Sequence, residues 1–214
     1  MEKPFDLKII NLAHRLDRRE ESFRECIRTG LGITSNQFFE ARHVPNNGAL
    51  GCALSHGKLL ADFLFESAKN HIMVLEDDFS VRDPEKFIAQ LNSAMSLAGS
   101  WDVFLLGHNT ALPIEGTQSP EIYRVINAQT TSGYLVSRGY AIKLIECFYR
   151  SADLLRRYDH LPDQFRVTAK GLFACDTLWK ELQTKDRFWA TFPSLIYQRA
   201  SFSDVEKRDV SYGV

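Results

Sequence analysis

The sequence is short of several features that define whole classes of protein. Its 214 residues include only four cysteines, Cys26, Cys52, Cys147 and Cys175, and no two of them form a Cys-x-x-Cys pair. This spacing argues against a disulfide framework or a zinc site. It favours reduced thiols in a cytosolic compartment, each serving as a small buried hydrophobic residue.

Excess charge and long apolar segments are missing as well. The 26 Lys and Arg residues nearly cancel the 27 Asp and Glu residues, leaving a net charge of -1. A balanced chain has no broad positive field for nucleic acid or an anionic membrane, which argues against a nucleic-acid binder. No run approaches the roughly 20 apolar residues that cross a bilayer, and residues 1–6 leave no room for a signal peptide. We therefore expect a cytoplasmic protein without a transmembrane segment, with peripheral membrane contact still open.

The chain is rich in what a single core needs. Hydrophobic residues make up 44% of it, and 15 residues are Phe. Folding of a chain of this length removes roughly 70% of its surface from water, so no metal or disulfide staple is required for stability. We expect one domain over residues 1–200, followed by a polar tail over 201–214 that has little to pack against.

Short apolar runs alternate with helical patterns. The predicted strands are 7–12, 37–44, 71–75, 101–106, 134–136 and 188–192. Helices are predicted around 23–30, over 50–65, from 84 to about 97, from 138 to about 155 and near 176–182, with Asp83 and Ser137 as caps. Residues 111–128 read as an irregular excursion or a small hairpin. This alternation predicts an α/β fold with a mainly parallel central sheet flanked by helices, whose ligand site lies off the carboxyl ends of the strands.

Three carboxylates follow directly after the most apolar predicted strand, in Leu75-Glu76-Asp77-Asp78. Residues two apart in an extended chain point the same way, so we expect Glu76 and Asp78 to share a divalent cation while Asp77 faces away. Mg²⁺ or Mn²⁺ suits a site with few carboxylates, several waters and phosphate oxygens. The plainer alternative is a solvated acidic turn, but crowding like charges against a buried strand favours a metal role.

A basic cluster follows the first predicted strand and should reach the same end of the sheet. Arg15, Arg18 and Arg19 could grip a diphosphate with their guanidinium groups. A charged helix start explains them equally well by spacing alone. Arginine near a helix N-terminus opposes the helix dipole, however, which hints at another purpose.

Other polar residues have plain structural explanations. His56 lies in a mostly apolar helix, where a hydrogen-bonded structural role is the common one. Asp176 opens a predicted helix and Asp163 follows Pro162, so both could be caps.

Taken in order, seven segments resemble glycosyltransferase family 25, which contains bacterial lipooligosaccharide galactosyltransferases and collagen galactosyltransferases. They are Ile10-Asn11-Leu12 with Arg15, Asp17 and Arg18; Phe39-Glu40-Ala41; Gly51-Cys52-Ala53-Leu54-Ser55-His56; Leu75-Glu76-Asp77-Asp78; Trp101-Asp102-Val103 to Gly107; Thr131 to Ser137; and Asp176-Thr177-Leu178-Trp179 with Pro193 to Gln198 and Ser203-Asp204. The chain departs from the family pattern at Ala13-His14, in place of a charged pair, and at Ala174-Cys175, in place of Pro-Val.

The resemblance implies a GT-A fold and an inverting, metal-dependent transfer of a hexose, galactose first, from a UDP-sugar to a glycan or glycosylated acceptor such as lipooligosaccharide. It implies Mn²⁺ or Mg²⁺ on Glu76 and Asp78, and Asp176 as the catalytic base, with Asp163 as its competitor. The donor would contact a set consisting of Asn11, Leu12, Arg15, Arg18, Glu40 and Asp77.

Two other functions remain open. A degenerate domain that binds sugar nucleotide or a protein partner without turnover would tolerate the departures near residues 13 and 174. A sugar nucleotidyltransferase also needs a divalent ion at a sheet end, but it would usually carry a Gly- and Lys-rich loop after the first strand, and residues 12–16 contain neither.

Overall fold

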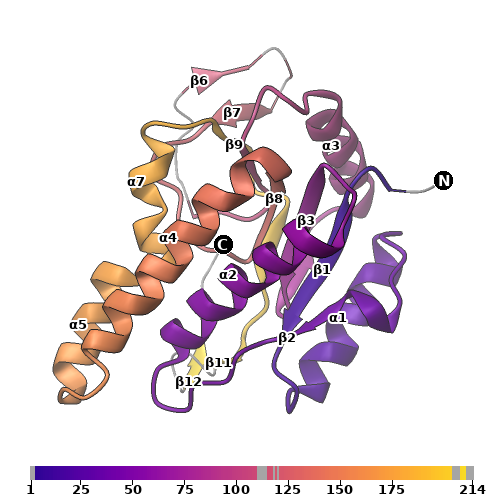
Figure 1. Cartoon of the computed structure of the whole chain (residues 1–214). Helices are drawn as coiled ribbons and strands as arrows, with labels where there is room; N and C mark the ends of the chain where they lie inside the picture. Colours follow the sequence, from indigo (N-terminus) through magenta and orange to yellow (C-terminus); the bar gives the residue numbers. More distant parts are fainter. Residues whose placement is uncertain (1–2, 110–114, 118, 120, 204–207, 211–214) are drawn as a thin grey trace.

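The computed structural model describes residues 3–109, 115–117, 119, 121–203 and 208–210, and shows a central sheet covered by helices (Figure 1). The sheet has eight strands in the order β2-β1-β3-β8-β5-β9-β7-β6. Their bounds are β1 Asp6–Asn11, β2 Phe38–Glu40, β3 His71–Glu76, β5 Val103–Leu105, β6 Glu115–Gly116, β7 Ile122–Arg124, β8 Gly133–Ser137 and β9 Phe188–Thr191. Strands β8 and β7 run antiparallel to their neighbours, and the remaining strands share one direction. The predicted mainly parallel α/β sheet is confirmed.

Two short strand pairs lie beside the main sheet. Strand β4, Phe79–Val81, pairs with β10, Ile196–Gln198, and this pairing was not predicted. Strand β11, Ser201–Ser203, pairs with β12, Arg208–Val210, so the polar tail contains a hairpin. The rest of the tail, including Asp204 of the closing family segment, lies outside the described residues.

Helices cover both faces of the sheet. The helices are α1 Leu16–Arg28, α2 Gly48–Glu66, α3 Pro84–Ser96, α4 Arg138–Arg157, α5 Asp163–Phe173, α6 Cys175–Leu178 and α7 Lys180–Gln183, with a 3₁₀ turn at Ser35–Gln37. Helices α2 and α4 pack side by side on one face, and α1 and α3 lie on the other side (Figure 1). Helix α5 was not predicted, because its apolar positions are largely exposed and its pattern is weak.

Two of the predicted helix starts can be checked at the caps. Asp83 caps α3 by accepting a hydrogen bond from the Lys86 backbone N–H, and Pro84 occupies the first helical position, as predicted. Ser137 stands at the N-cap of α4, but its side chain makes no capping hydrogen bond. Within 111–128, β6 and β7 form the hairpin that was one of the two predicted forms, although residues 110–114, 118 and 120 lie outside the described residues.

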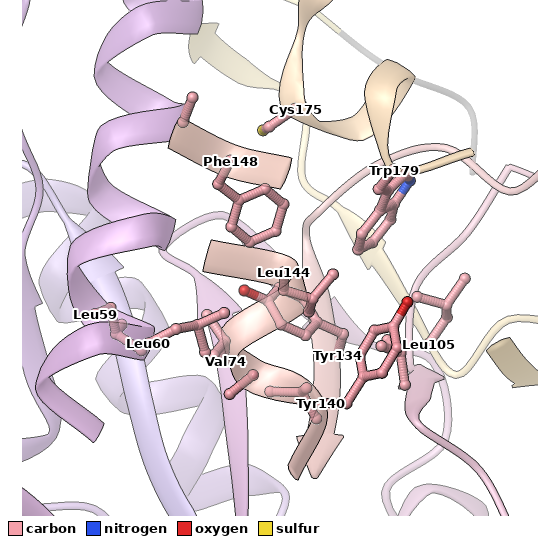
Figure 2. Close-up of a cluster of buried hydrophobic side chains, with 14 of the residues drawn as sticks. Leu59, Leu60, Val74, Leu105, Tyr134, Tyr140, Leu144, Phe148, Cys175 and Trp179 are labelled. Atoms are coloured by element: carbon pink, nitrogen blue, oxygen red, sulfur yellow. The ribbon is translucent and has the colours of Figure 1, made fainter. Parts of the chain in front are cut away.

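The alternation of side chains along the strands divides the core into two layers. Ile72 and Val74 of β3 face α2 and α4, whereas Met73 and Leu75 face α1 and α3. Figure 2 shows the α2/α4 layer, in which Cys175 lies close to Phe148 at the margin of the cluster. Large aromatic side chains fill both layers of the core. The resulting close packing keeps the sheet rigid, and with it the residues at its edge.

One glycine sets the spacing at the carboxyl edge of the sheet. Strand β8 begins at Gly133, which pairs with Leu75 near the end of β3. A Cβ at position 133 would lie 2.3 Å from Cδ1 of Ile196 and 2.9 Å from Cδ2 of Leu75. Any larger residue there would therefore force the side chains of Ile196 and Leu75 to shift.

Candidate functional site

A cavity of about 510 Å³ opens at the carboxyl ends of β1 and β3. One part of its wall, here called the acidic wall, consists of Arg18, Glu76, Asp77 and Asp78. A second part, here called the α2–α6 wall, consists of Cys52, His56, Cys175 and Asp176. The cavity lies where ligands bind in open α/β sheets, and its volume suits a small-molecule site.

The acidic wall differs from the predicted geometry. Strand β3 ends at Glu76, and the chain turns at Asp77 and Asp78. Nη1 of Arg18 lies 3.0 Å from Asp77 Oδ1 and 3.2 Å from Asp78 Oδ2. The expectation that Asp77 faces away from the other acids is therefore wrong, because the period-two alternation of a strand does not continue into a turn.

Arg199 holds this acidic turn in place through the turn's backbone carbonyls. Its guanidinium group donates hydrogen bonds to the carbonyl oxygens of Asp77 (2.9 Å) and Phe79 (2.6 Å). Its backbone N–H donates to the carbonyl of Asp78 at 2.8 Å. The segment after β10 thus fixes the turn from outside, leaving the carboxylates directed inward.

Asn11 stands behind the cavity wall and supports Asp77. Its Nδ2 donates to Asp77 Oδ2 at 2.7 Å and to the Arg15 carbonyl at 3.1 Å. Burial raises the pKa of Asp77, although the Arg18 charge and the Asn11 hydrogen bond oppose the shift. Asp77 is therefore held by both an amide and a guanidinium group.

Asp78 is supported less well. Burial and the neighbouring charge of Glu76 raise the pKa of Asp78 to about 7, against the opposing charge of Arg18. Asp78 has a further partner apart from Arg18. Both carboxylate oxygens of Asp78 lie 3.5 Å from Nε2 of Gln198, at the outer limit of a hydrogen bond. A buried carboxylate with weak partners is a group that an added cation would stabilise.

Glu76 belongs to both walls. Thr131 donates a hydrogen bond to Glu76 Oε1 at 2.6 Å, and Nε2 of His56 lies 3.3 Å from the same oxygen. Burial acts to raise the pKa of Glu76, but the contacts with His56 and Thr131 outweigh it and the net shift is downward. His56 also contacts the Tyr134 hydroxyl through Nδ1 at 2.9 Å, which agrees with the predicted hydrogen-bonded role.

The structure brings together two cysteines that the sequence treats separately. Sγ of Cys52 on α2 lies 3.8 Å from Sγ of Cys175 on α6, and the two residues are 123 positions apart. The hydrogen bond with Cys175, aided by His56, lowers the pKa of Cys52 to about 6 despite burial. Both thiols pack against the apolar core, as predicted, and in addition they contact each other at the cavity wall.

Asp176 lies in the cavity wall, whereas its competitor does not. The Thr130 backbone N–H donates to Asp176 Oδ2 at 3.3 Å, and Ala174 occupies the N-cap position that Asp176 could have taken. Burial and the charge of Glu76 raise the pKa of Asp176. The side chain of Asp163 is 85% exposed and pairs with Arg166 outside the wall.

The remaining predicted donor-binding residues divide between the cavity and its surroundings. Leu12 lines the cavity. The lining does not include Asn11, Arg15 or Glu40. Arg15 instead pairs with Asp17 at 2.8 Å, and Glu40 is exposed at the end of β2. For Arg18, the unfavourable position in the first turn of α1 is explained by its contact with the acidic turn.

Several lining residues were missed from the sequence. Lys170 and Val167 come from α5, and Gln198 comes from β10. The glycine at position 51 is the one signal in the sequence for this part of the wall. A Cβ there would lie 2.5 Å from the Arg42 carbonyl oxygen, so helix α2 can approach residue 42 only at a glycine. This close approach docks residues 41–44 against α2 as part of the cavity wall.

No family model matches the sequence, and no match was found among curated proteins. The fold is similar to that of the mannose-1-phosphate geranyltransferase from Thermus thermophilus, with a TM-score of 0.50 and 12% identity over 87% of this chain and 73% of that one. A197 from STIV has a TM-score of 0.48 and 12% identity over 96% and 93% of the two chains. A glycosyltransferase involved in glycosylation of the PBCV-1 major capsid has a TM-score of 0.42 and 10% identity over 94% and 97%.

The first of these similarities shows the fold and no more. It supports the predicted GT-A-like class, in which a mixed α/β sheet carries its site at the carboxyl edge. Among the described residues, every helix is too short or too polar to cross a bilayer.

Proposed function

We propose that this protein is an inverting, divalent-cation-dependent glycosyltransferase that moves a hexose, with galactose as the first candidate, from a UDP-sugar to a hydroxyl group. The observation that carries the proposal is the placing of Asp176 and the acidic turn around one cavity. Residues almost a hundred positions apart supply the two kinds of carboxylate that the reaction needs, one for a cation and one for a proton.

The residues present fit a hard divalent cation. Asp78 has a pKa of about 7 because it is buried beside Glu76, so its negative charge lacks full compensation from the protein. Asp78 and Glu76 would hold the ion, and Mn²⁺ or Mg²⁺ suits their oxygen ligands. Such an ion neutralises charge on a departing diphosphate when bound.

Asp176 supplies the base in this proposal. The acceptor hydroxyl oxygen forms a bond to the anomeric carbon as the bond from that carbon to the diphosphate oxygen breaks. Asp176 takes the hydroxyl proton, and the UDP leaves with the bonding electrons, so the anomeric configuration inverts. A raised pKa improves a carboxylate as a base near neutral pH.

Arg18 makes the acidic wall tolerant of a phosphate group. Its guanidinium lies against both Asp77 and Asp78, so part of the local negative charge is neutralised before a donor arrives. Leu12 contributes an apolar part of the lining, and Lys170 a second positive charge. The acceptor class, lipooligosaccharide or another glycan, stays part of the proposal.

A donor panel tests the proposal. The protein is incubated with Mn²⁺ and each of UDP-galactose, UDP-glucose and the UDP-N-acetylhexosamines, and UDP release is measured with and without simple galactoside and glucoside acceptors. We expect one donor to turn over, with loss of turnover when a chelator removes the cation. Asp78→Asn should lose the cation-dependent turnover, while Asp163→Asn serves as the matched control outside the cavity. Absence of turnover with every donor would contradict the proposal.

A sugar nucleotidyltransferase is the second candidate, because the fold comparison supports it equally well. Against it stands the short connection from β1 to α1, residues 12–15, which has no glycine and no lysine to cradle a triphosphate. Pyrophosphate release from a nucleoside triphosphate and a sugar 1-phosphate would favour this activity over sugar transfer.

A further inference from the structure

The α2–α6 wall contains a cluster of metal-binding side chains distinct from the acidic turn. Sγ of Cys52, a ring nitrogen of His56 and a carboxylate oxygen of Glu76 all lie within 4.8 Å of one another. Sγ of Cys175 lies 3.8 Å from Sγ of Cys52 and is the neighbouring thiol of this three-residue group. Two thiols, an imidazole and a carboxylate form a donor set typical of zinc rather than of Mg²⁺ or Mn²⁺.

The spacing of these donors matches the edges of a tetrahedral zinc site. With Zn–S bonds of about 2.3 Å, two sulfur ligands lie about 3.8 Å apart, and with Zn–N and Zn–O bonds of about 2.0 Å, a nitrogen and an oxygen lie about 3.3 Å apart. The observed distances are 3.8 Å between the Cys52 and Cys175 sulfurs and 3.3 Å between His56 Nε2 and Glu76 Oε1. These two of the six edges have the required length, whereas Sγ of Cys175 lies outside the group of donors within 4.8 Å of one another and must turn toward it when the ion binds.

The surrounding structure orients the ligands as metal sites usually do. Cys52 and His56 are four positions apart on α2, so their side chains lie on one face of the helix. Nδ1 of His56 lies 2.9 Å from the Tyr134 hydroxyl, which fixes the ring and leaves Nε2 directed toward the cluster. His56 and Tyr134 are 1% and 0% exposed, so this arrangement is held by the core.

We propose that Cys52, His56, Glu76 and Cys175 bind a thiophilic divalent cation of the zinc class, which ties α2 to the start of α6. Binding forms two metal–thiolate bonds, and a thiol that still holds its proton releases it to solvent. The role is structural positioning, because Cys175 directly precedes Asp176 and the ion fixes the peptide between them. A carboxylate has two oxygens, so contact through Oε1 of Glu76 leaves the other available to the cation proposed at the acidic turn.

Cobalt(II) is the probe, because tetrahedral thiolate coordination gives it intense visible and near-ultraviolet absorption. Full-length protein, reduced and stripped with a chelator, is titrated with Co²⁺ without any sugar nucleotide. We expect the thiolate absorption bands to saturate at one Co²⁺ per chain, to be bleached by Zn²⁺, and the melting temperature to rise with Zn²⁺. Cys52→Ser and Cys175→Ser should each lose the thiolate bands, whereas Cys147→Ser, a half-buried thiol outside the cavity wall, should keep them.

A milder variant guards against misfolding of the cysteine variants. Tyr134→Phe keeps the ring in the core and removes the hydroxyl that contacts His56, so Zn²⁺ affinity should fall about tenfold with circular dichroism unchanged. Folded protein that shows no cobalt–thiolate bands, or one in which Cys52 and Cys175 join in a disulfide and exclude the metal, would overturn the proposal.

The outcome is separable from that of the proposed function. Asp78→Asn should retain the cobalt bands and lose cation-dependent sugar transfer, since Asp78 is not among the donors of the cluster. Cobalt binding without any sugar transfer would support the metal cluster and contradict the proposed function. Sugar transfer without cobalt–thiolate bands would support the proposed function and contradict the metal cluster.

Discussion

The two walls of the cavity are built in opposite ways. The acidic wall takes its carboxylates from three consecutive positions, Glu76 to Asp78, at the end of one strand. The α2–α6 wall joins Cys52 and Cys175 across 123 positions and two helices. The reactive groups of the acidic wall are neighbours in the sequence, whereas those of the α2–α6 wall come together only when the chain folds.

This difference determines how each wall should respond to substitution. The carboxylates of the acidic wall depend on a cation, supplied by Arg18 in the structure, to compensate their charge. The α2–α6 wall depends on the packing of α2 against α4 and α6 to keep its donors in place. Removing a charged side chain should therefore disturb the acidic wall most. Removing a metal ligand or a proton acceptor should disturb the α2–α6 wall most.

The largest effect is expected at Asp176. Asp176→Asn keeps the size of the side chain but removes the proton acceptor, so the transfer rate should fall about 10²- to 10⁴-fold. UDP-sugar affinity, measured by calorimetry, should change little. Equal loss of affinity and rate would show that Asp176 serves binding rather than proton transfer.

The next largest effect should come from the cation of the acidic wall. Arg18→Met leaves Asp77 and Asp78 buried without their guanidinium partner and should lower the free energy of unfolding by about 3–5 kcal/mol. Arg24→Met is the matched control on the same helix, because its pair with Glu20 is exposed and contributes little. Denaturant unfolding measures both, and similar losses in the two variants would contradict the role given to Arg18.

A smaller effect should appear as a dependence of stability on pH. The pKa of Asp78 is about 7 in the folded protein and near 3.8 when unfolded, so the folded state holds a proton that the unfolded state has lost. Asp78 should therefore make the stability of the metal-free protein fall as pH rises from about 4 to 7, contributing at most about 1.4 kcal/mol per pH unit. Asp78→Asn should flatten this slope in thermal melts, and an unchanged slope would assign it to another group.

The smallest effect is expected at Glu40, which the sequence places among the donor contacts. Its exposed side chain lies outside the cavity lining, so Glu40→Gln should change both stability and UDP-sugar affinity by no more than about 0.5 kcal/mol. A larger loss of affinity would extend the binding site beyond the cavity to the end of β2.

Local patterns were sufficient for most of the fold. Apolar runs located the principal strands, and Asp83-Pro84 located the start of α3, because caps and strand burial depend on neighbouring residues. Helix α5 and the β4–β10 pair were missed, since the exposed apolar face of α5 and the three-residue length of β4 leave weak signals.

The site divides in the same manner. The Glu76-Asp77-Asp78 run was visible at once, but the direction of Asp77 was not, because it depends on a turn held by Arg199 from a distant segment. The Cys52–Cys175 contact has no sequence signal, since neither spacing nor composition relates residues on α2 and α6. Contacts of long sequence separation require the topology first.

The size of residue 133 bears on the acidic turn from a distance. A single added methyl group at this position would collide with Ile196, which lies two residues before Gln198, the amide that faces Asp78. Relief of that collision falls first on the side chains of Ile196 and Leu75, and only a shift that they cannot absorb would pass along β10 to Gln198. The surroundings of the carboxylates are thus coupled, through one isoleucine, to the bulk of a residue that bears no polar side chain.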